Sequence, residues 1–439
     1  MIRTWRPATA CVAALAGWLV ARPLPAEPTD PPPQTRAEAW RRLREEKRQR
    51  LEPYKPTFLE RQILGFEKAE RPSILDLNFE GFYLRVRSLA SGSRWAPVLH
   101  FWRPDIKGST FSVHASAAYS PTAYQLYDFQ AGRLPHHGRA LPPPSTKGDD
   151  LYELGGLQKS SLDHLILYTS LRYRHQPRDA FFGLGQDSRE SDRTAFLYQD
   201  ASYELVGGWQ FNRRLVASAR AGYVQVSTSD GEDDDFPPIG ARFDDRSAPG
   251  LARQPDFLKL SGLLLFDGRD RPFNPHRGGM VALELARFDD RDGDAFAFHR
   301  AAVDARGYVS LGSPQRVLAT RVRASRDEAA EGSRVPFYLQ DALSNSHTLR
   351  GYQTFRFRGE RLVSLQAEYR WEAAPALELV VFGDAGRVFR PEEDLDLDGL
   401  RGSMGVGLRL KSAEDVLARF DVAWGGEGSR VYLRFGPSF

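Results

Sequence analysis

The sequence contains a single cysteine, Cys11, among its 439 residues. It lies in an amino-terminal segment with the features of a secretory signal: a basic start, an apolar run and a small-residue cleavage point after Ala26. The alternative, a helical membrane anchor, is disfavoured because the apolar run from Ala8 to Ala21 is too short to span a bilayer. We therefore expect residues 1–26 to be removed, and the mature chain to have no disulfides, zinc–thiolate sites or cysteine nucleophiles.

Net charge is also nearly absent. The whole sequence has 60 Lys and Arg against 57 Asp and Glu. Because Arg3, Arg6 and Arg22 lie in the expected signal, the mature chain keeps 57 charges of each sign. We interpret the basic run at 41–50 as a solvated helix face, and we do not expect nucleic acid as a partner.

Long hydrophobic runs are missing after the signal. The sequence has no apolar stretch of 18 residues there, and its mean hydropathy is −0.47. This excludes transmembrane helices. It does not exclude a membrane barrel, whose strands alternate apolar and polar residues and so average to a hydrophilic score.

Residues 27–73 differ in composition from the rest of the chain. They begin with a proline-rich stretch that predicts an extended linker. Two capping boxes follow, Thr35 with Glu38 and Thr57 with Glu60, and each predicts the start of a short helix. We expect a periplasmic segment whose helices either close a barrel lumen or dock a periplasmic partner.

From Ile74 onward, apolar and polar residues alternate with period two. The stretch 361–371 shows the pattern clearly: one face carries Val363, Leu365, Ala367, Tyr369 and Trp371, and the other Ser364, Gln366, Glu368 and Arg370. Strands of roughly ten residues that recur to the end of the sequence are typical of a transmembrane barrel. The predicted fold class is all-β, an antiparallel barrel of about 16 strands over residues 74–439, with a short helical amino-terminal extension.

The connections fall into two sets. Short turns are expected on the periplasmic side and longer acidic loops on the outside. An insertion at 135–160 falls on the periplasmic side by this count. Inward-facing arginines such as Arg306 and Arg419 are expected to pair with lumen acids such as Asp304 and Asp421.

One strand carries a carboxylate on its inner face. In 377–389 the alternation sends Phe382, Asp384 and Gly386 into the lumen. A buried carboxylate is costly unless a cation meets it. The loop 344–360 supplies Arg350, which reaches Asp384 if the loop folds inward.

Three further residues belong to the same prediction. Glu368, on the neighbouring strand, points toward the same place in the lumen. Gly351 is expected to allow a sharp backbone turn, and Tyr352 to pack against the lumen wall.

These residues resemble a known family. The stretch "TLRGYQTFRF" is similar to the (V/L)RG(F/Y) motif in the sixth extracellular loop of BamA-type barrels, the bacterial surface antigen superfamily, and "FGDAG" to its F-x-D-x-G strand motif. The resemblance covers residues 74–439 and implies a sixteen-stranded outer-membrane barrel with Arg350 bridging Asp384 and Glu368. It also implies contact with outer-membrane lipid and lipopolysaccharide, and insertion by the barrel assembly machinery.

The end of the sequence fits a carboxy-terminal assembly signal made of Tyr432, Phe435 and Phe439. The alternation places Phe439 with Val431 and Leu433 on one apolar face, opposite Tyr432.

The chain departs from the family in two places. Ser344-Asn345 stands where the family often has Gly-Gly. Residues 27–72 are too short for one POTRA domain, so we expect a member without POTRA domains.

No metal site or cofactor is expected. The stretch 394–399 opens like a calcium loop with Asp394, Asp396 and Asp398, but the twelfth position is Gly405 instead of glutamate. We found no catalytic constellation, and the sequence lacks the G-x-S-x-G motif of a lipase fusion.

Two functions stay open: protein or lipid insertion or transport at the outer membrane, and a passive or gated pore with loop 344–360 as its constriction.

Overall fold

The computed structural model describes residues 35–50, 81–90, 93, 95–103, 106, 109–134, 164–271, 274–293, 295–344, 347–390, 393, 398–411, 416–434 and 438–439. The chain separates into two units, residues 1–57 and 58–439. The predicted second helix, which starts after Thr57, and the insertion at 135–160 lie outside the described residues.

The first unit contains the helix α1 (Arg36–Arg50). Its predicted amino-terminal cap is present, since the Glu38 amide donates to Thr35 Oγ1 at 3.2 Å. Trp40 and Leu43, three positions apart on one face of the helix, are each 58% exposed. Within the described ranges, no helix has the length and hydropathy needed to cross a membrane.

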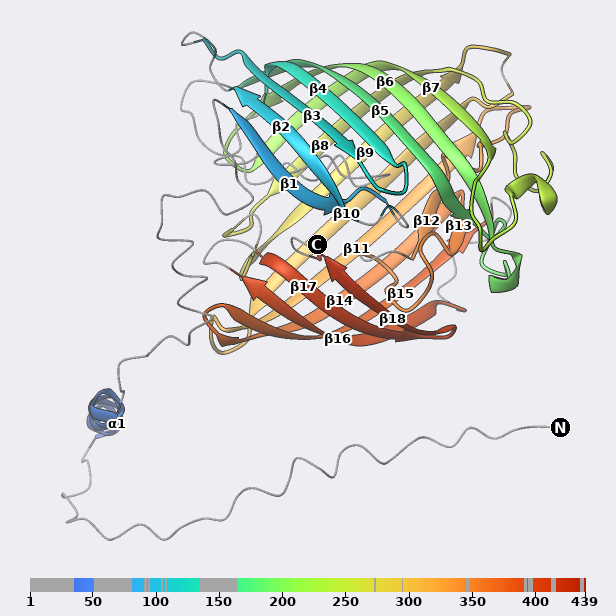
Figure 1. Cartoon of the computed structure of the whole chain (residues 1–439). Helices are drawn as coiled ribbons and strands as arrows, with labels where there is room; N and C mark the ends of the chain where they lie inside the picture. The colour runs from blue at the N-terminus through green and yellow to red at the C-terminus, as the bar shows by residue number, and fades with distance from the viewer. Residues whose placement is uncertain are drawn as a thin grey trace, which may run out of the picture. The chain divides into compact units, whose positions relative to one another are not determined.

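The second unit is a sheet of 16 strands, each antiparallel to the next along the chain (Figure 1). This confirms the predicted fold class and strand number. The strands are β1 (Phe82–Ser88), β2 (Trp95–Arg103), β3 (Ser112–Tyr119), β4 (Gln125–Arg133), β5 (Leu165–Phe181), β6 (Thr194–Gln210), β7 (Leu215–Asp230), β8 (Phe257–Asp267), β9 (Gly278–Asp290), β10 (Phe298–Ser310), β11 (Arg316–Ala329), β14 (Arg361–Ala374), β15 (Leu377–Phe389), β16 (Arg401–Lys411), β17 (Val416–Gly425) and β18 (Gly428–Arg434).

The two faces of each strand differ as the alternation predicts. In β15, Leu379 and Val381 are exposed on the outside, whereas Val380, Phe382 and Asp384 are buried inside. The same parity holds in β14, where the four polar residues of the inner face are buried and the apolar residues of the outer face are half-buried or exposed. An apolar outer surface over a polar interior is the arrangement of a transmembrane barrel.

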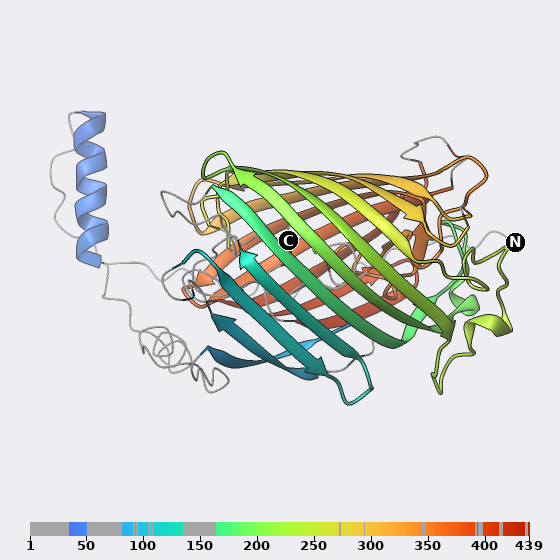
Figure 2. The same ribbon diagram turned by 90° about the horizontal axis from the view of Figure 1, so that it is seen from above.

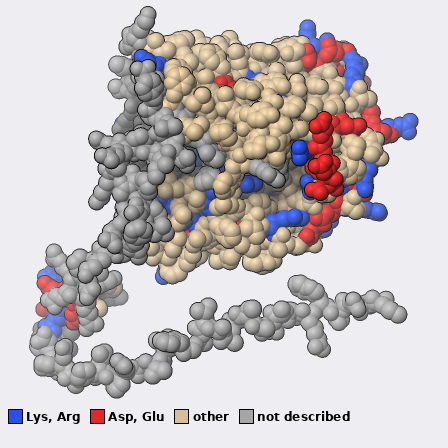
Figure 3. All heavy atoms as spheres, in the orientation of Figure 1, with Lys and Arg blue, Asp and Glu red and all other residues tan. Residues whose placement is uncertain are grey.

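Three long connections leave the sheet at one end, and several short turns lie at the other (Figure 2). The turns after β6, β8, β10 and β14 are short, and the connections after β5, β7 and β11 are long. Acidic side chains gather at the end that carries the long connections (Figure 3). The exposed acids of the loop between β7 and β8 are Glu232, Asp234, Asp235 and Asp244.

The long connections fold over the barrel end and enclose an aromatic cluster. Phe337, in the connection after β11, lies 4.9 Å from the ring of Phe181 and 5.1 Å from that of Phe196, centroid to centroid. Phe257 and Phe298 belong to the same buried cluster. The end of the lumen beneath the long loops is therefore filled by packed side chains.

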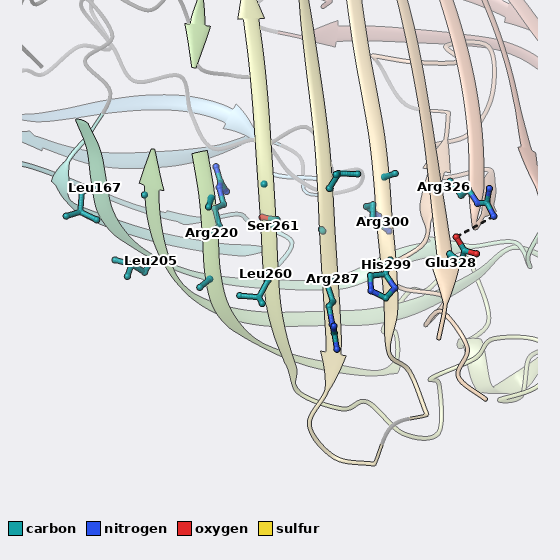
Figure 4. Close-up of a pocket in the computed structure, with 17 residues that line it drawn as sticks. Leu167, Leu205, Arg220, Leu260, Ser261, Arg287, His299, Arg300, Arg326 and Glu328 are labelled. Atoms are coloured by element: carbon teal, nitrogen blue, oxygen red, sulfur yellow. Dashed lines mark ion pairs between the residues drawn. The ribbon is translucent and has the colours of Figure 1, made fainter. Parts of the chain in front are cut away.

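The outer face has a shallow depression of about 690 Å³ over β5 to β11 (Figure 4). Its floor includes Gly207 and Gly262, where an added Cβ would meet no atom within 4 Å. Exposed leucines border it, and Arg326 and Glu328 form an ion pair at 3.4 Å at its edge.

The sheet has two edges, β1 and β18. Among the described residues, no backbone pairing joins these two strands, and Figure 1 shows them apart. Each edge therefore presents a row of backbone N–H and C=O groups without a neighbouring strand.

Candidate functional site in the barrel lumen

A short hairpin brings loop 344–360 into the lumen. It pairs β12 (Asp341–Leu343) with β13 (Phe357–Gly359), and Leu343 faces Phe357. Gly386 on β15 makes room for this hairpin, because a Cβ there would lie 2.9 Å from Leu343 Cδ1.

The segment between β12 and β13 begins at Ser344, whose φ is +77°. This left-handed conformation favours glycine, which gives a physical reason for glycine at this place in the related motif. The Ser344 hydroxyl donates to the Leu349 carbonyl at 3.0 Å, and its amide donates to Thr348 Oγ1 at 3.2 Å. These bonds hold a serine in the conformation that otherwise suits glycine.

Arg350 lies against both predicted carboxylates. Its Nε and Nη2 donate to the two oxygens of Asp384 at 2.8 and 2.7 Å, and its Nη1 donates to Glu368 Oε1 at 2.8 Å. The guanidinium also stacks over Phe382, with Cζ 3.4 Å from the ring centroid. All three charged residues are buried.

The neighbouring carboxylates keep Arg350 charged. Burial opposes the charged form, but the hydrogen bond to Asp384 and the charges of Glu368 and Asp384 outweigh it, so the pKa of Arg350 is raised. The bidentate geometry is the strong form of an arginine–carboxylate contact.

Glu368 is shared by several donors. Arg409 Nη2 also donates to Oε1 at 2.9 Å, and Arg370 Nε donates to Oε2 at 2.9 Å. Arg419 lies 3.6 Å from Asp421, one of the pairs predicted for the lumen. The other, Arg306 with Asp304, is present at 3.0 Å.

Gly351 lies in a turn, but close packing and not a positive φ is what requires glycine there. Gly351 has no positive φ; glycine is needed because a Cβ would lie 2.6 Å from both the Gly425 amide nitrogen and Ser403 Cβ. The loop backbone therefore packs directly onto the wall formed by β16 and β17.

Tyr352 packs against the wall as predicted. Its ring contacts Phe357 at 5.4 Å between centroids, and its hydroxyl accepts a bond from the Gly426 amide at 3.1 Å. Tyr432 of β18 donates to the Arg350 carbonyl at 2.7 Å. Tyr432 thus holds the loop. The sequence indicates Tyr432 only as part of an assembly signal and does not predict this contact.

The loop is also bound to the connection between β5 and β6. Arg356 Nη2 donates to the Ser188 carbonyl at 2.6 Å, and the Gly185 amide donates to the Arg358 carbonyl at 2.7 Å. Arg356 also pairs with Glu427 at 2.8 Å. Sequence reasoning missed Arg356, although the arginine-rich "FRFRGE" after Arg350 was the available signal.

The predicted position of Phe439 is wrong. Val431 and Leu433 face outward, but Phe439 is 5% exposed and packs inside the barrel against Tyr308. Ser438 is also inside, where its hydroxyl donates to Glu368 Oε2 at 2.9 Å. The alternation fails here because Phe439 packs against Tyr308 and Ser438 binds Glu368 on the lumen wall. Phe435 lies outside the described residues.

The calcium candidate gains no support. Asp394 and Asp396 lie outside the described residues, and the Asp398 carbonyl accepts a bond from Arg387 Nη1. In the part of the chain that the structure describes, no group of three or more His, Cys, Asp or Glu residues is arranged to hold a metal ion.

Comparison with known proteins agrees with this fold. Residues 159–439, more than half of the chain, match the Omp85 superfamily domain. Among curated proteins, none matches the chain.

Two solved barrels are similar in structure. BamA from Haemophilus ducreyi lacking POTRA domains 1–3 is 15% identical, with a TM-score of 0.54 over 82% of this chain and 70% of that one. CdiB from Escherichia coli is 12% identical, with a TM-score of 0.51 over 81% of this chain and 62% of that one. At these identities, the likeness concerns the fold alone.

Omp85 barrels reside in the bacterial outer membrane and are assembly or translocation proteins, not enzymes. The match to their domain extends over every residue of the lumenal site. The chain therefore belongs to the Omp85 superfamily and is a β-barrel of the bacterial outer membrane.

Proposed function

We propose that this barrel assists the insertion of proteins into the outer membrane through the seam between β1 and β18. The unpaired seam is the observation that carries the proposal. An incoming strand can add to either edge by backbone hydrogen bonding, the mode of recognition known as β-augmentation. Within a membrane such edges are otherwise costly, because lipid cannot satisfy their N–H and C=O groups.

The packed side chains of the described part of the lumen favour this route over a pore. The aromatic cluster around Phe337 fills the end beneath the long loops, and the network around Arg350 fills the middle. A passive pore would need both to move. A substrate that uses the seam does not have to pass through either of them.

The amino-terminal residues 27–73 fit the same proposal as the site of a periplasmic partner. The exposed pair Trp40 and Leu43 on α1 provides an apolar contact on an otherwise charged helix. An exposed aromatic on a helix face is a common anchor for a protein partner.

The test is an insertion assay in liposomes that contain the purified folded barrel. A urea-unfolded outer-membrane barrel is added, and its folding rate is followed by electrophoretic mobility. We expect acceleration by the wild type and its loss in Asp384→Asn, because Arg350 then loses its bidentate partner. Asp245→Asn, which removes an exposed loop pair with Arg334, is the matched control.

Folded wild-type barrel that gives no acceleration over empty liposomes contradicts insertion. Equal acceleration by the wild type and by Asp384→Asn would show that insertion does not depend on the contacts between loop 344–360 and the lumen wall.

A further inference from the structure

Four arginines line a pocket at the end of the barrel opposite the long connections. The pocket has a volume of about 390 Å³, and we call it the rim pocket. The turns after β6 and β8 and the strand ends beside them form its lining, which consists of Arg213, Arg214, Asp267, Gly268, Arg269, Asp270, Arg277 and Gly278. Short turns of an outer-membrane barrel face the periplasm, so the rim pocket lies at the periplasmic surface.

Hydrogen bonds to the backbone fix the two turns. The Asp267 amide donates to the Arg214 carbonyl at 2.7 Å and so joins one turn to the other. Asn212 Oδ1 accepts from the Arg214 amide at 2.8 Å, and Asp270 Oδ1 accepts from the Arg277 amide at 3.2 Å. The backbone around the rim pocket is therefore held in place by the protein itself.

The positive charges of the rim pocket outnumber its negative charges. Arg269 and Asp267 form a bidentate pair, with Nε–Oδ1 at 2.9 Å and Nη2–Oδ2 at 2.7 Å, so these two charges offset each other. The other three arginines of the lining are left with one carboxylate, that of Asp270, which gives an excess of two positive charges. Arg213 and Arg214 are exposed, and their side chains form no hydrogen bond or ion pair within the described ranges. These guanidinium groups are available to an anion.

Exposed aromatic side chains lie beside the rim pocket. Trp209 and Phe211 lie at the end of β6, and Phe266 lies on the outer face at the end of β8. The Phe266 ring approaches the lining, since a Cβ on Gly268 would be 3.2 Å from Phe266 Cε1. Aromatic girdles at the ends of barrel strands mark the interface between membrane and water. The rim pocket therefore combines excess positive charge with a position at the level of lipid headgroups.

We propose that the rim pocket binds the phosphate group of an anionic phospholipid in the periplasmic leaflet. The guanidinium groups of Arg213, Arg214 and Arg277 donate to the phosphate oxygens, a pairing that the planar donor geometry of arginine favours. The acyl chains lie along Trp209 and Phe266. This inference goes beyond the proposed function and does not depend on the seam, because β6 to β9 lie in the interior of the sheet.

The test is lipid retention by the folded full-length barrel. The barrel is released from nanodiscs of equal parts phosphatidylglycerol and phosphatidylethanolamine, and native mass spectrometry counts the lipids that stay bound. We expect phosphatidylglycerol to be retained in preference to phosphatidylethanolamine. Arg214→Gln should reduce this retention about fivefold, and Arg213→Gln combined with Arg214→Gln about 25-fold, because each basic side chain near an anionic lipid contributes about that factor.

Arg316→Gln is the matched control. Arg316 is an exposed arginine at the start of β11, at the same end of the barrel but outside the rim pocket. Its variant should retain phosphatidylglycerol like the wild type. Because Arg213, Arg214 and Arg316 are all exposed, none of these variants disturbs the packed interior.

Phe266→Ala distinguishes a lipid from a free phosphate ion. It removes an apolar contact and keeps every arginine, so phosphatidylglycerol retention should fall, while binding of inorganic phosphate, measured by equilibrium dialysis in detergent, should stay at the wild-type level. Unchanged lipid retention in Phe266→Ala, together with displacement of the lipid by inorganic phosphate, would show that the pocket recognises a free anion and would overturn the inference.

Equal retention of the two lipids by the wild type would also overturn it, as would wild-type retention in the variant that lacks both Arg213 and Arg214. Binding of hexaglutamate without retention of phosphatidylglycerol would assign the rim pocket to an acidic protein segment instead. Insertion of a substrate barrel is not measured in any of these experiments, so failure of this inference is distinguishable from failure of the proposed function.

Discussion

At the scale of single residues, the buried charges of the lumen depend on one another. Arg350 is 1% exposed, binds the carboxylates of Glu368 and Asp384, and lies 3.9 Å from that of Asp421. A buried ion pair contributes little net stability compared with apolar packing, but removal of one partner leaves an uncompensated charge. The site should therefore respond far more strongly to a broken pair than the surface does.

Asp384→Asn should lower the free energy of unfolding by about 3–5 kcal/mol, because Arg350 then loses its bidentate carboxylate partner. Urea titration of the barrel in detergent micelles, followed by tryptophan fluorescence, measures the change. Asp245→Asn removes a partly exposed pair with Arg334 and should cost at most about 1 kcal/mol. Equal losses in the two variants would show that the buried Asp384 contact contributes no more to stability than the partly exposed pair does.

Gly351→Ala should displace the loop, since the added Cβ would lie 2.6 Å from the Gly425 amide nitrogen and from Ser403 Cβ. Trypsin should then cleave after Arg350 and Arg356, which the wild type protects by burial. Gly383→Ala is the control, because Gly383 faces outward and its nearest neighbour would be 4.0 Å away. An uncleaved Gly351→Ala barrel would contradict the close packing described here.

The contact between Arg350 and Asp384 was predictable because strand parity, the cost of a buried carboxylate and the family resemblance all indicate it. The reason for Gly351 was not. A glycine in a sequence does not reveal whether it permits a positive φ or a close approach, because the second depends on Ser403 and Gly425, which lie about fifty and seventy residues further along the chain.

At the scale of elements, period two determines which residues meet lipid. Strand β15 alternates from Leu377 to Val388, so Val381 is 59% exposed on the outside while its neighbours are buried. Register errors of one residue would exchange these faces completely.

Val381→Arg should cost about 2–4 kcal/mol of barrel stability, because an arginine on the lipid face is most costly near the bilayer midplane. Unfolding in lipid bilayers is the appropriate measurement, since detergent does not reproduce the membrane depth. Glu331→Arg, in the exposed connection after β11, should be nearly neutral. A neutral Val381→Arg would place β15 outside the hydrocarbon region.

The strands were predictable from alternation, but two features at this scale were not. The hairpin of β12 and β13 has only three residues in each strand, too few to show a period. Phe439 has the right parity for the outer face, yet it lies in the lumen. Its position is decided by Tyr308 and Arg370, which are distant in sequence.

At the scale of the whole barrel, a pore needs an open lumen, whereas an insertase that uses the seam works with a lumen occupied by side chains. Deletion of residues 347–356 removes Arg350 and the loop contacts with β16 and β17. Single-channel conductance in planar bilayers should be small in the wild type and larger and noisier in the deletion variant. Large steady conductance in the wild type would favour the pore.

The sequence predicts how many strands there are, but not that β1 and β18 remain apart. Alternation describes each strand on its own, whereas closure of a sheet depends on the balance of contacts at its two edges. This balance is a property of the assembled barrel.

The central claim is that substrates enter through the seam, and a reversible disulfide across it tests this most directly. Leu84→Cys with Val431→Cys would join β1 to β18 when the two edges come within disulfide range. Phe420→Cys with Leu433→Cys would join two strands that are already paired. Insertion of an unfolded barrel into liposomes is measured before and after reduction. We predict that the seam disulfide abolishes acceleration until it is reduced, while the control disulfide has no effect. Full acceleration with the seam disulfide intact would contradict this account.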